Sequence, residues 1–205
     1  MNWPNRITLL RLLLVAPFVV LMQHQQAQPV CRYVAMGLLM VVAASDVADG
    51  FLARRLASKT RLGAILDPLA DKALITCAAV LLALPHSSVR GARLPDWVVV
   101  TIVGKDLWVV IGFAVLFLLT GKVRVRPAWA GKLCTAAQLA MVLAVLISPE
   151  LNRLVPQLGR YLATVLWWIV AALSLAATIS YTRMGLAFLA EEEPPNSSAR
   201  SSGQA

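Results

Sequence analysis

Six long apolar segments separated by short polar connections constrain the fold of this chain more than any other feature. Apolar residues make up 59% of the 205 residues and charged residues only 14%, whereas soluble domains hold about 45–50% and about 25%. A helix needs about 20 residues to cross a bilayer, so the length allows about six crossings. The apolar runs are continuous rather than alternating, which favours helices over a β-barrel. The predicted fold class is therefore an all-α integral membrane protein, a six-transmembrane-helix bundle.

The short connections between these segments predict a single transmembrane domain over residues 1–189. Residues 190–205 are polar and contain Pro, Ser, Asn and Gly, and this composition predicts a disordered C-terminal tail. The predicted spans are 7–22, 31–53, 62–84, 95–119, 128–147 and 161–189.

The distribution of basic residues predicts the orientation of the bundle. The chain carries 19 Lys and Arg against 10 Asp and Glu, for a net charge of +9. More of these basic residues fall on the side that both termini share than in the opposite loops, and such a bias marks the cytoplasmic side. We therefore expect a multi-pass protein of a bacterial-type inner membrane with both termini in the cytoplasm. Anionic membrane lipids explain the basic charge, so no nucleic-acid partner is expected.

Four aspartates lie within one short stretch, residues 46–71, at the ends of two apolar segments. Asp46 and Asp49 are three residues apart, and Asp67 and Asp71 are four apart, so each pair shares one face of its predicted helix. Small side chains accompany both pairs and would let a ligand approach the backbone. These small residues are Gly50, Ala53 and Gly63.

Four carboxylates at membrane depth require an explanation, because each costs a few kcal/mol unless it is paired or hydrated. One explanation is that they are unrelated helix-end charges, paired with the basic residues of positions 54–61. Divalent metal ions satisfy all four more economically, and Mg²⁺ or Mn²⁺ favours such hard oxygen ligands. Two such ions can hold a phosphoryl group between a nucleophile and a leaving group. The aspartates therefore predict a metal-dependent phosphoryl-transfer site.

The spacing of these residues follows the pattern D-x2-D-G-x2-A-R-x8-G-x3-D-x3-D without a gap. Its positions are occupied by Asp46, Asp49, Gly50, Ala53, Arg54, Gly63, Asp67 and Asp71. With this pattern the chain resembles the CDP-alcohol phosphatidyltransferase family of integral membrane phospholipid synthases. The resemblance extends over about residues 1–185 and includes the six-helix layout.

The resemblance implies a reaction and a set of site residues. The four aspartates are expected to bind two divalent ions, Mg²⁺ or Mn²⁺, which hold the diphosphate of CDP-diacylglycerol at the cytoplasmic face. Asp71 is also the expected catalytic residue, a general base on the hydroxyl of a polar or lipid alcohol acceptor. That hydroxyl attacks the lipid-linked phosphorus and CMP leaves. The residues expected to contact the CDP-lipid are Asn5, Thr8, Gly50, Ala53, Arg54, Thr60 and Gly63.

The acceptor is less strongly indicated. Residues 131–138 read G-K-x2-T-x2-Q and resemble a motif of the branch that makes phosphatidylglycerophosphate from glycerol 3-phosphate. Basic residues near this motif are suited to an anionic acceptor. The expected acceptor-binding residues are Lys105, Arg126 and Lys132. That branch usually has Arg-Glu where this chain has Lys105-Asp106, which is closer to the Arg-Asp of the cardiolipin synthase branch. Phosphatidylglycerol therefore stays open as the alternative acceptor.

The sequence leaves two further functions open and also predicts how the protein assembles. The aspartates also suit the ion site of a divalent-cation transporter, although the chain lacks the matching second half that such proteins often have. An inactive membrane scaffold is a third reading that nothing in the pattern favours. Gly104, Gly112 and Gly131 are expected to allow close helix packing, and a homodimer is predicted.

Overall fold

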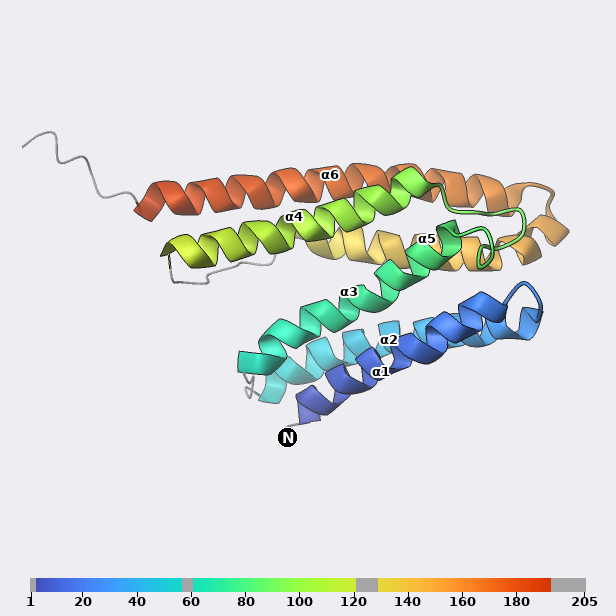
Figure 1. Cartoon of the computed structure of the whole chain (residues 1–205), viewed down its shortest axis with the longest axis horizontal. Coiled ribbons are helices and arrows are strands. Elements are labelled where there is room, and N and C mark those ends of the chain that lie inside the picture. Colours follow the sequence, from blue (N-terminus) through green and yellow to red (C-terminus); the bar gives the residue numbers. More distant parts are fainter. Residues whose placement is uncertain (1–2, 57–60, 121–128, 193–205) are drawn as a thin grey trace, which may run out of the picture.

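A computed structural model describes the backbone of residues 3–56, 61–120 and 129–192. It describes side chains over 13–45, 72–112, 114–116, 118 and 131–188. Across these ranges all regular structure is helical (Figure 1). The helices are α1 (Trp3–His24), α2 (Pro29–Leu56), α3 (Arg61–Ala83), α4 (Asp96–Thr120), α5 (Trp129–Leu154) and α6 (Leu158–Glu192).

The helices run up and down along one long axis, so alternate connections lie at opposite ends of the bundle (Figure 1). The α1–α2, α3–α4 and α5–α6 connections lie at one end, which we call the loop end. The start of α1 and the end of α6 lie toward the other end, together with the end of α2 and the start of α3. We call this the terminal end. The start of α1 and the end of α6 therefore lie toward the same end of the bundle.

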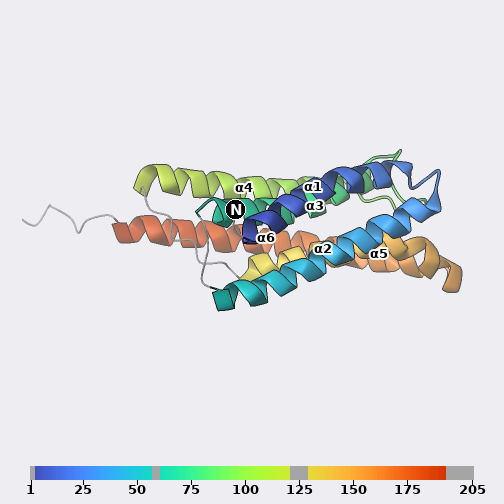
Figure 2. The same cartoon turned by 90° about the horizontal axis from the view of Figure 1, so that it is seen from below.

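Two groups of helices make up the bundle. In one group α1 packs against α2 and α3, and in the other α6 packs against α4 and α5. Contacts of α3 with α4 and α5, and of α2 with α5, join the two groups. Figure 2 shows the bundle from below, with α1 and α2 inclined to α4 and α6. The helix α3 thus lies between the two groups, and it carries part of the aspartate pattern.

Among the described side chains, the buried apolar core includes the loop end of the bundle. Its largest fully buried side chains come from five helices and from the loop before α4. They include Phe18, Met22, Leu39, Leu82, Leu94, Ile102 and Met141. Buried Ser87 and Ser88 of the α3–α4 loop cover this end, where the Gln26 amide donates to the carbonyls of Pro85 at 2.8 Å and Ser88 at 2.9 Å.

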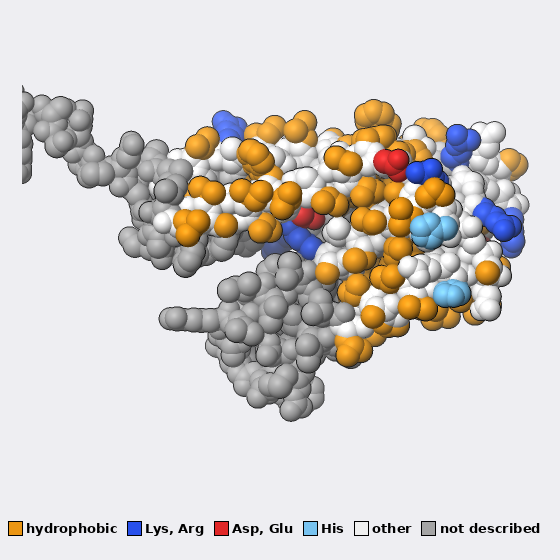
Figure 3. Space-filling model, viewed as in Figure 1, with side chains coloured by type: hydrophobic (Ala, Val, Ile, Leu, Met, Phe, Trp, Pro, Cys, Tyr) orange, Lys and Arg blue, Asp and Glu red, His pale blue; other side chains and the backbone are white. Residues whose placement is uncertain are grey.

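Many large apolar side chains are also exposed on the described part of the bundle, and the space-filling view shows them on one face (Figure 3). On α4 the exposed residues include Val100, Leu107, Val110 and Leu118. A soluble monomer rarely exposes a continuous apolar surface of this extent, whereas lipid tails solvate it without cost. The exposed apolar surface is therefore what a membrane protein is expected to have, and the described chain is all-helical, as the sequence predicts.

Three helices contain described stretches that are long and apolar enough to cross a membrane, namely Asp96–Leu116, Gly131–Leu154 and Leu158–Phe188. The other three contain shorter described apolar stretches, namely Leu13–His24, Pro29–Ser45 and Lys72–Ala83. The count of six spans stays a prediction. The disordered C-terminal tail stays a prediction, because α6 is described to Glu192 and residues 193–205 lie outside the described chain.

The fifth helix extends beyond the end of its predicted span. Sequence analysis placed its end at residue 147, just before Pro149, but α5 continues through Pro149 to Leu154. Proline has no N–H to donate to the carbonyl four residues earlier, which here belongs to Val145. The Ser148 hydroxyl, which is buried, donates to this carbonyl at 2.8 Å. A neighbouring side chain thus replaces the missing backbone donor, and the helix continues.

The three glycines expected to allow close packing differ in their surroundings. A β-carbon at Gly131 would collide with the hydroxyl end of Tyr181, so here α5 and α6 do approach closely. At Gly104 and Gly112, no described atom of this chain lies within 4 Å of that position. Packing within the described chain therefore does not explain these two glycines, and the homodimer stays a prediction.

Candidate functional site

The aspartate pattern lies on two helices, α2 and α3, whose consecutive ends both lie toward the terminal end of the bundle (Figure 1). Asp46 and Asp49 belong to the second half of α2, and Asp67 and Asp71 to the first half of α3. Both helices are continuous over these positions, so each pair lies on one helical face, as its spacing predicts. The side chains of these aspartates lie outside the described residues.

The other residues of the predicted CDP-lipid site fall in the same region. Asn5 and Thr8 belong to the first turns of α1, which packs against α3. Gly50, Ala53 and Arg54 continue α2, and Gly63 begins α3. The side-chain positions of this set lie outside the described residues, as do Thr60 and Arg126 entirely.

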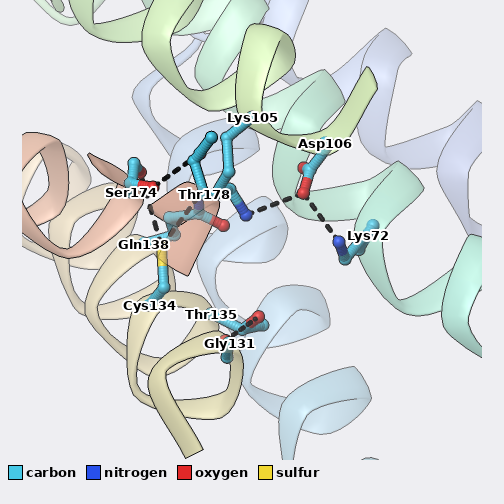
Figure 4. Close-up of polar contacts among 9 residues, drawn as sticks. All are labelled: Lys72, Lys105, Asp106, Gly131, Cys134, Thr135, Gln138, Ser174 and Thr178. Atoms are coloured by element: carbon cyan, nitrogen blue, oxygen red, sulfur yellow. Dashed lines mark hydrogen bonds and ion pairs between the residues drawn. The ribbon is translucent and has the colours of Figure 1, made fainter. Parts of the chain in front are cut away.

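The described part of the site centres on Asp106 of α4 (Figure 4). Its Oδ1 atom lies 2.7 Å from the Lys105 Nζ and 2.7 Å from the Lys72 Nζ of α3. The Lys105 side chain is 5% exposed, that of Asp106 is 17% exposed and that of Lys72 is 36% exposed. One carboxylate thus neutralises part of the charge of two ammonium groups from neighbouring helices. We call these three residues the lysine–aspartate cluster.

The cluster connects two parts of the site that the sequence predicted separately. Lys105 is a predicted acceptor-binding residue, and Lys72 directly follows Asp71, the predicted general base. Ionisable groups inside a membrane bundle are costly, and they are usually paired and functional. The ion pairs therefore place a predicted acceptor residue next to the helix that carries two of the four aspartates.

A second polar group lies between α5 and α6. The Gln138 amide is buried and donates to the Cys134 Sγ at 3.6 Å, and that sulfur lies 3.4 Å from the Ser174 Oγ. The Thr178 hydroxyl donates to the Ser174 carbonyl at 2.9 Å. Figure 4 draws these residues in one view with the lysine–aspartate cluster. Lys132, the other described acceptor candidate, is exposed on the first turns of α5.

Sequence reasoning identified Lys105 as a site residue but missed the role of Asp106 as its partner. In the sequence, Asp106 stands out only because one family branch usually has Arg-Glu where this chain has Lys105-Asp106. The signal that could have identified it was present, because an acid beside a lysine within an apolar span needs a partner. The pairing with Lys72 was not accessible in this way, since it joins residues 34 positions apart.

Comparison with known proteins shows the family of the chain. The family model for CDP-alcohol phosphatidyltransferase matches residues 1–179, and the chain belongs to this family. The protein is therefore a membrane transferase of phospholipid synthesis, and neither a cation transporter nor an inactive scaffold is needed to explain the aspartates.

Several relatives share one name, CDP-diacylglycerol–glycerol-3-phosphate 3-phosphatidyltransferase. The Bacillus subtilis (strain 168) protein is 32% identical over 156 residues, which cover 71% of this chain and 77% of the relative. The Pseudomonas fluorescens protein is 36% identical over 152 residues, with 73% and 74% covered. The Escherichia coli (strain K12) protein is 31% identical over 193 residues, with 93% and 98% covered.

Proposed function

We propose that this protein transfers the phosphatidyl group of CDP-diacylglycerol to glycerol 3-phosphate and releases CMP. The observation that carries the proposal is the likeness, over nearly the full length of both chains, to relatives that bear this activity in their names. The buried ammonium of Lys105 adds independent support, because a cation held inside an apolar bundle is suited to an anionic acceptor.

The proposed metal site consists of Asp46, Asp49, Asp67 and Asp71. Four carboxylates are the hard oxygen donors that Mg²⁺ and Mn²⁺ prefer, so the chemistry of the donor set fits two such ions. When bound, these ions offset the negative charge that builds up on the reacting diphosphate. Positions three and four residues apart on two continuous helices bring the donors of each pair to one face.

The chain's own residues bind the substrates and move a proton in this proposal. Arg54 offsets negative charge on the nucleotide phosphates, and the small residues beside the aspartates leave room for the nucleotide. The CDP-lipid site comprises Asn5, Thr8, Gly50, Ala53, Arg54, Thr60 and Gly63. Asp71 accepts the proton of the acceptor hydroxyl as the oxygen attacks phosphorus, and CMP departs.

Lys105, Arg126 and Lys132 bind the phosphate of the acceptor in this proposal. Glycerol 3-phosphate carries a phosphate monoester with up to two negative charges, so several cations are appropriate. The Asp106 departure noted in the sequence acquires a different meaning from its contacts. Because Asp106 pairs with Lys72 and Lys105, its role in this proposal is to hold lysines of the chain, and the choice of acceptor rests on the relatives.

The proposed topology places both termini and the active site on the cytoplasmic side of an inner membrane. The arrangement of the helices supports this, because the start of α1, the end of α2, the start of α3 and the end of α6 lie toward one end (Figure 1). Arg54 and Arg55 at the end of α2 and Arg61 at the start of α3 belong to the same end, where the positive-inside rule expects such residues.

The test is CMP release by the purified full chain in detergent with CDP-diacylglycerol and Mg²⁺. Parallel reactions contain glycerol 3-phosphate, phosphatidylglycerol or no acceptor. CMP release that depends on glycerol 3-phosphate supports the proposal. Release with phosphatidylglycerol alone would contradict it and assign a cardiolipin synthase activity. No release with either acceptor, from protein that is monodisperse and folded, would reject both.

A further inference from the structure

We infer that Asp106 is a positioning residue for the acceptor site: it fixes the Lys105 ammonium by tying it to Lys72 of α3. The inference rests on the proposed function, since it concerns how the proposed acceptor site is built. It assigns a role to a residue that the aspartate pattern does not contain.

The direction of the Lys105 side chain needs a cause. Consecutive residues of a helix do not face each other, because they are turned by about 100° around the axis. Even so, Lys105 and Asp106 are neighbours on α4, and the Lys105 Nζ lies 2.7 Å from Asp106 Oδ1. The long lysine side chain must therefore be directed toward Asp106, and through it toward α3. Figure 4 shows the carboxylate between the two ammonium groups.

Lys72 supplies the anchor that gives this direction a fixed end point. It donates to the same oxygen, Asp106 Oδ1, from a different helix. Neutralising the charge of buried Lys105 requires only the contact between Lys105 and Asp106. The additional contact of Asp106 with Lys72, which is much more exposed, therefore indicates a further role. A carboxylate held from α3 instead stays in one place while it holds Lys105. The pair of bonds thus sets the position of the Lys105 ammonium relative to the helix that bears Asp67 and Asp71.

The charge balance of the cluster leaves it ready for an anion. Two ammonium groups and one carboxylate carry a net charge of +1. An ammonium has three N–H donors, and the bond to Asp106 uses one donor of Lys105. Its other donors can bind a phosphate oxygen without breaking the contact with Asp106. The cluster can therefore hold Lys105 in place before and during acceptor binding, which lowers the ordering cost of binding.

Replacing Asp106 distinguishes positioning from simple electrostatics, because the two predict opposite signs. Asp106→Asn removes a negative charge near an anion site, so charge alone would lower the KM for glycerol 3-phosphate. Positioning predicts that this KM rises about tenfold, because the two lysines then repel each other and Lys105 loses its fixed direction. The KM for CDP-diacylglycerol should stay unchanged. Asp106→Glu, which keeps the charge, should restore most of the affinity.

The matched control is Asp96→Asn, the same substitution on the same helix. Asp96 is exposed at the loop end and pairs with Arg93 at 3.0 Å. It should leave both KM values unchanged. Lys72→Gln provides a second variant if Asp106→Asn fails to fold, since it removes the anchor and keeps the Lys105–Asp106 contact. It should also raise the KM for glycerol 3-phosphate, by a smaller factor.

All variants are assayed as the full chain in detergent with CDP-diacylglycerol and Mg²⁺, and their thermal unfolding is followed in parallel. An unchanged or lowered KM for glycerol 3-phosphate in active Asp106→Asn would overturn the inference while leaving the proposed function intact. A parallel loss of kcat and of affinity for both substrates, with reduced thermal stability, would assign a structural role and also overturn it. A wild-type chain that is inactive with glycerol 3-phosphate would instead reject the proposed function, and the inference with it.

Discussion

Arg32 of α2 and Glu150 of α5 form an ion pair that joins the two helix groups near the loop end. Their side chains are only 12% and 25% exposed. The Tyr33 hydroxyl donates to the same Glu150 oxygen at 2.5 Å. The aspartate pattern is at the opposite end of α2, so this pair contributes to the stability of the fold and does not take part in the chemistry.

Glu150→Gln should therefore destabilise the protein without changing its substrate affinity. Removing one partner of a largely buried ion pair leaves the other charge poorly compensated, which costs about 2–4 kcal/mol. Thermal unfolding in detergent measures the loss. Asp96→Asn is the comparison, because its pair with Arg93 is exposed and contributes about 0–1 kcal/mol. Equal effects of the two substitutions would contradict this interpretation.

Gly159 at the start of α6 should not tolerate even a methyl group. A β-carbon there would lie 2.7 Å from the Ser148 Cα, and the Gly159 N–H donates to the Asn152 side chain at 2.8 Å. Gly159→Ala should cost about 1–3 kcal/mol through overpacking, measured as a lower melting temperature. Gly37→Ala is the matched control, because no described atom lies near its added carbon. In that helical position alanine should be neutral or stabilising.

Loss of either α3 aspartate should abolish turnover while the bundle stays folded. Asp71→Asn removes the proposed general base and a proposed metal ligand, and Asp67→Asn removes a ligand only. Each should lower kcat by about a thousandfold or more, as measured by CMP release. Size-exclusion profiles and melting temperatures should match those of the wild type. Full activity in either variant would be incompatible with the proposed site.

The two described lysines of the proposed acceptor site should act on acceptor binding. Lys132→Ala should raise the KM for glycerol 3-phosphate more than that for CDP-diacylglycerol. Lys105→Met should do so more strongly, by about ten to a hundredfold, because Lys105 is buried and held by Asp106. Arg160→Ala, at the loop end of α6, serves as the control for loss of one positive charge. An equal rise of both KM values in Lys132→Ala would place this residue outside the acceptor site.

Much of the fold was predictable because its signals are local. The length and continuity of the apolar runs indicated each helix, and helix boundaries differed from the prediction by a few residues. The largest difference has a structural cause. The fifth helix continues past its predicted end at residue 147 and through Pro149 to Leu154, because the Ser148 hydroxyl bonds the carbonyl that proline leaves without a donor. A propensity rule cannot include that contact, because it depends on the side-chain rotamer in the folded helix.

The sequence by itself determined the membrane class, the helical character of the chain and the aspartate pattern. These follow from hydrophobicity and from the helical repeat, which act over a few turns. Only the tertiary structure decided which charges meet. Arg32 and Glu150 are 118 positions apart, and Lys72 and Asp106 are 34 apart. Such pairs form only when helices pack, because burial removes water as the competing partner and makes each charge depend on its neighbour.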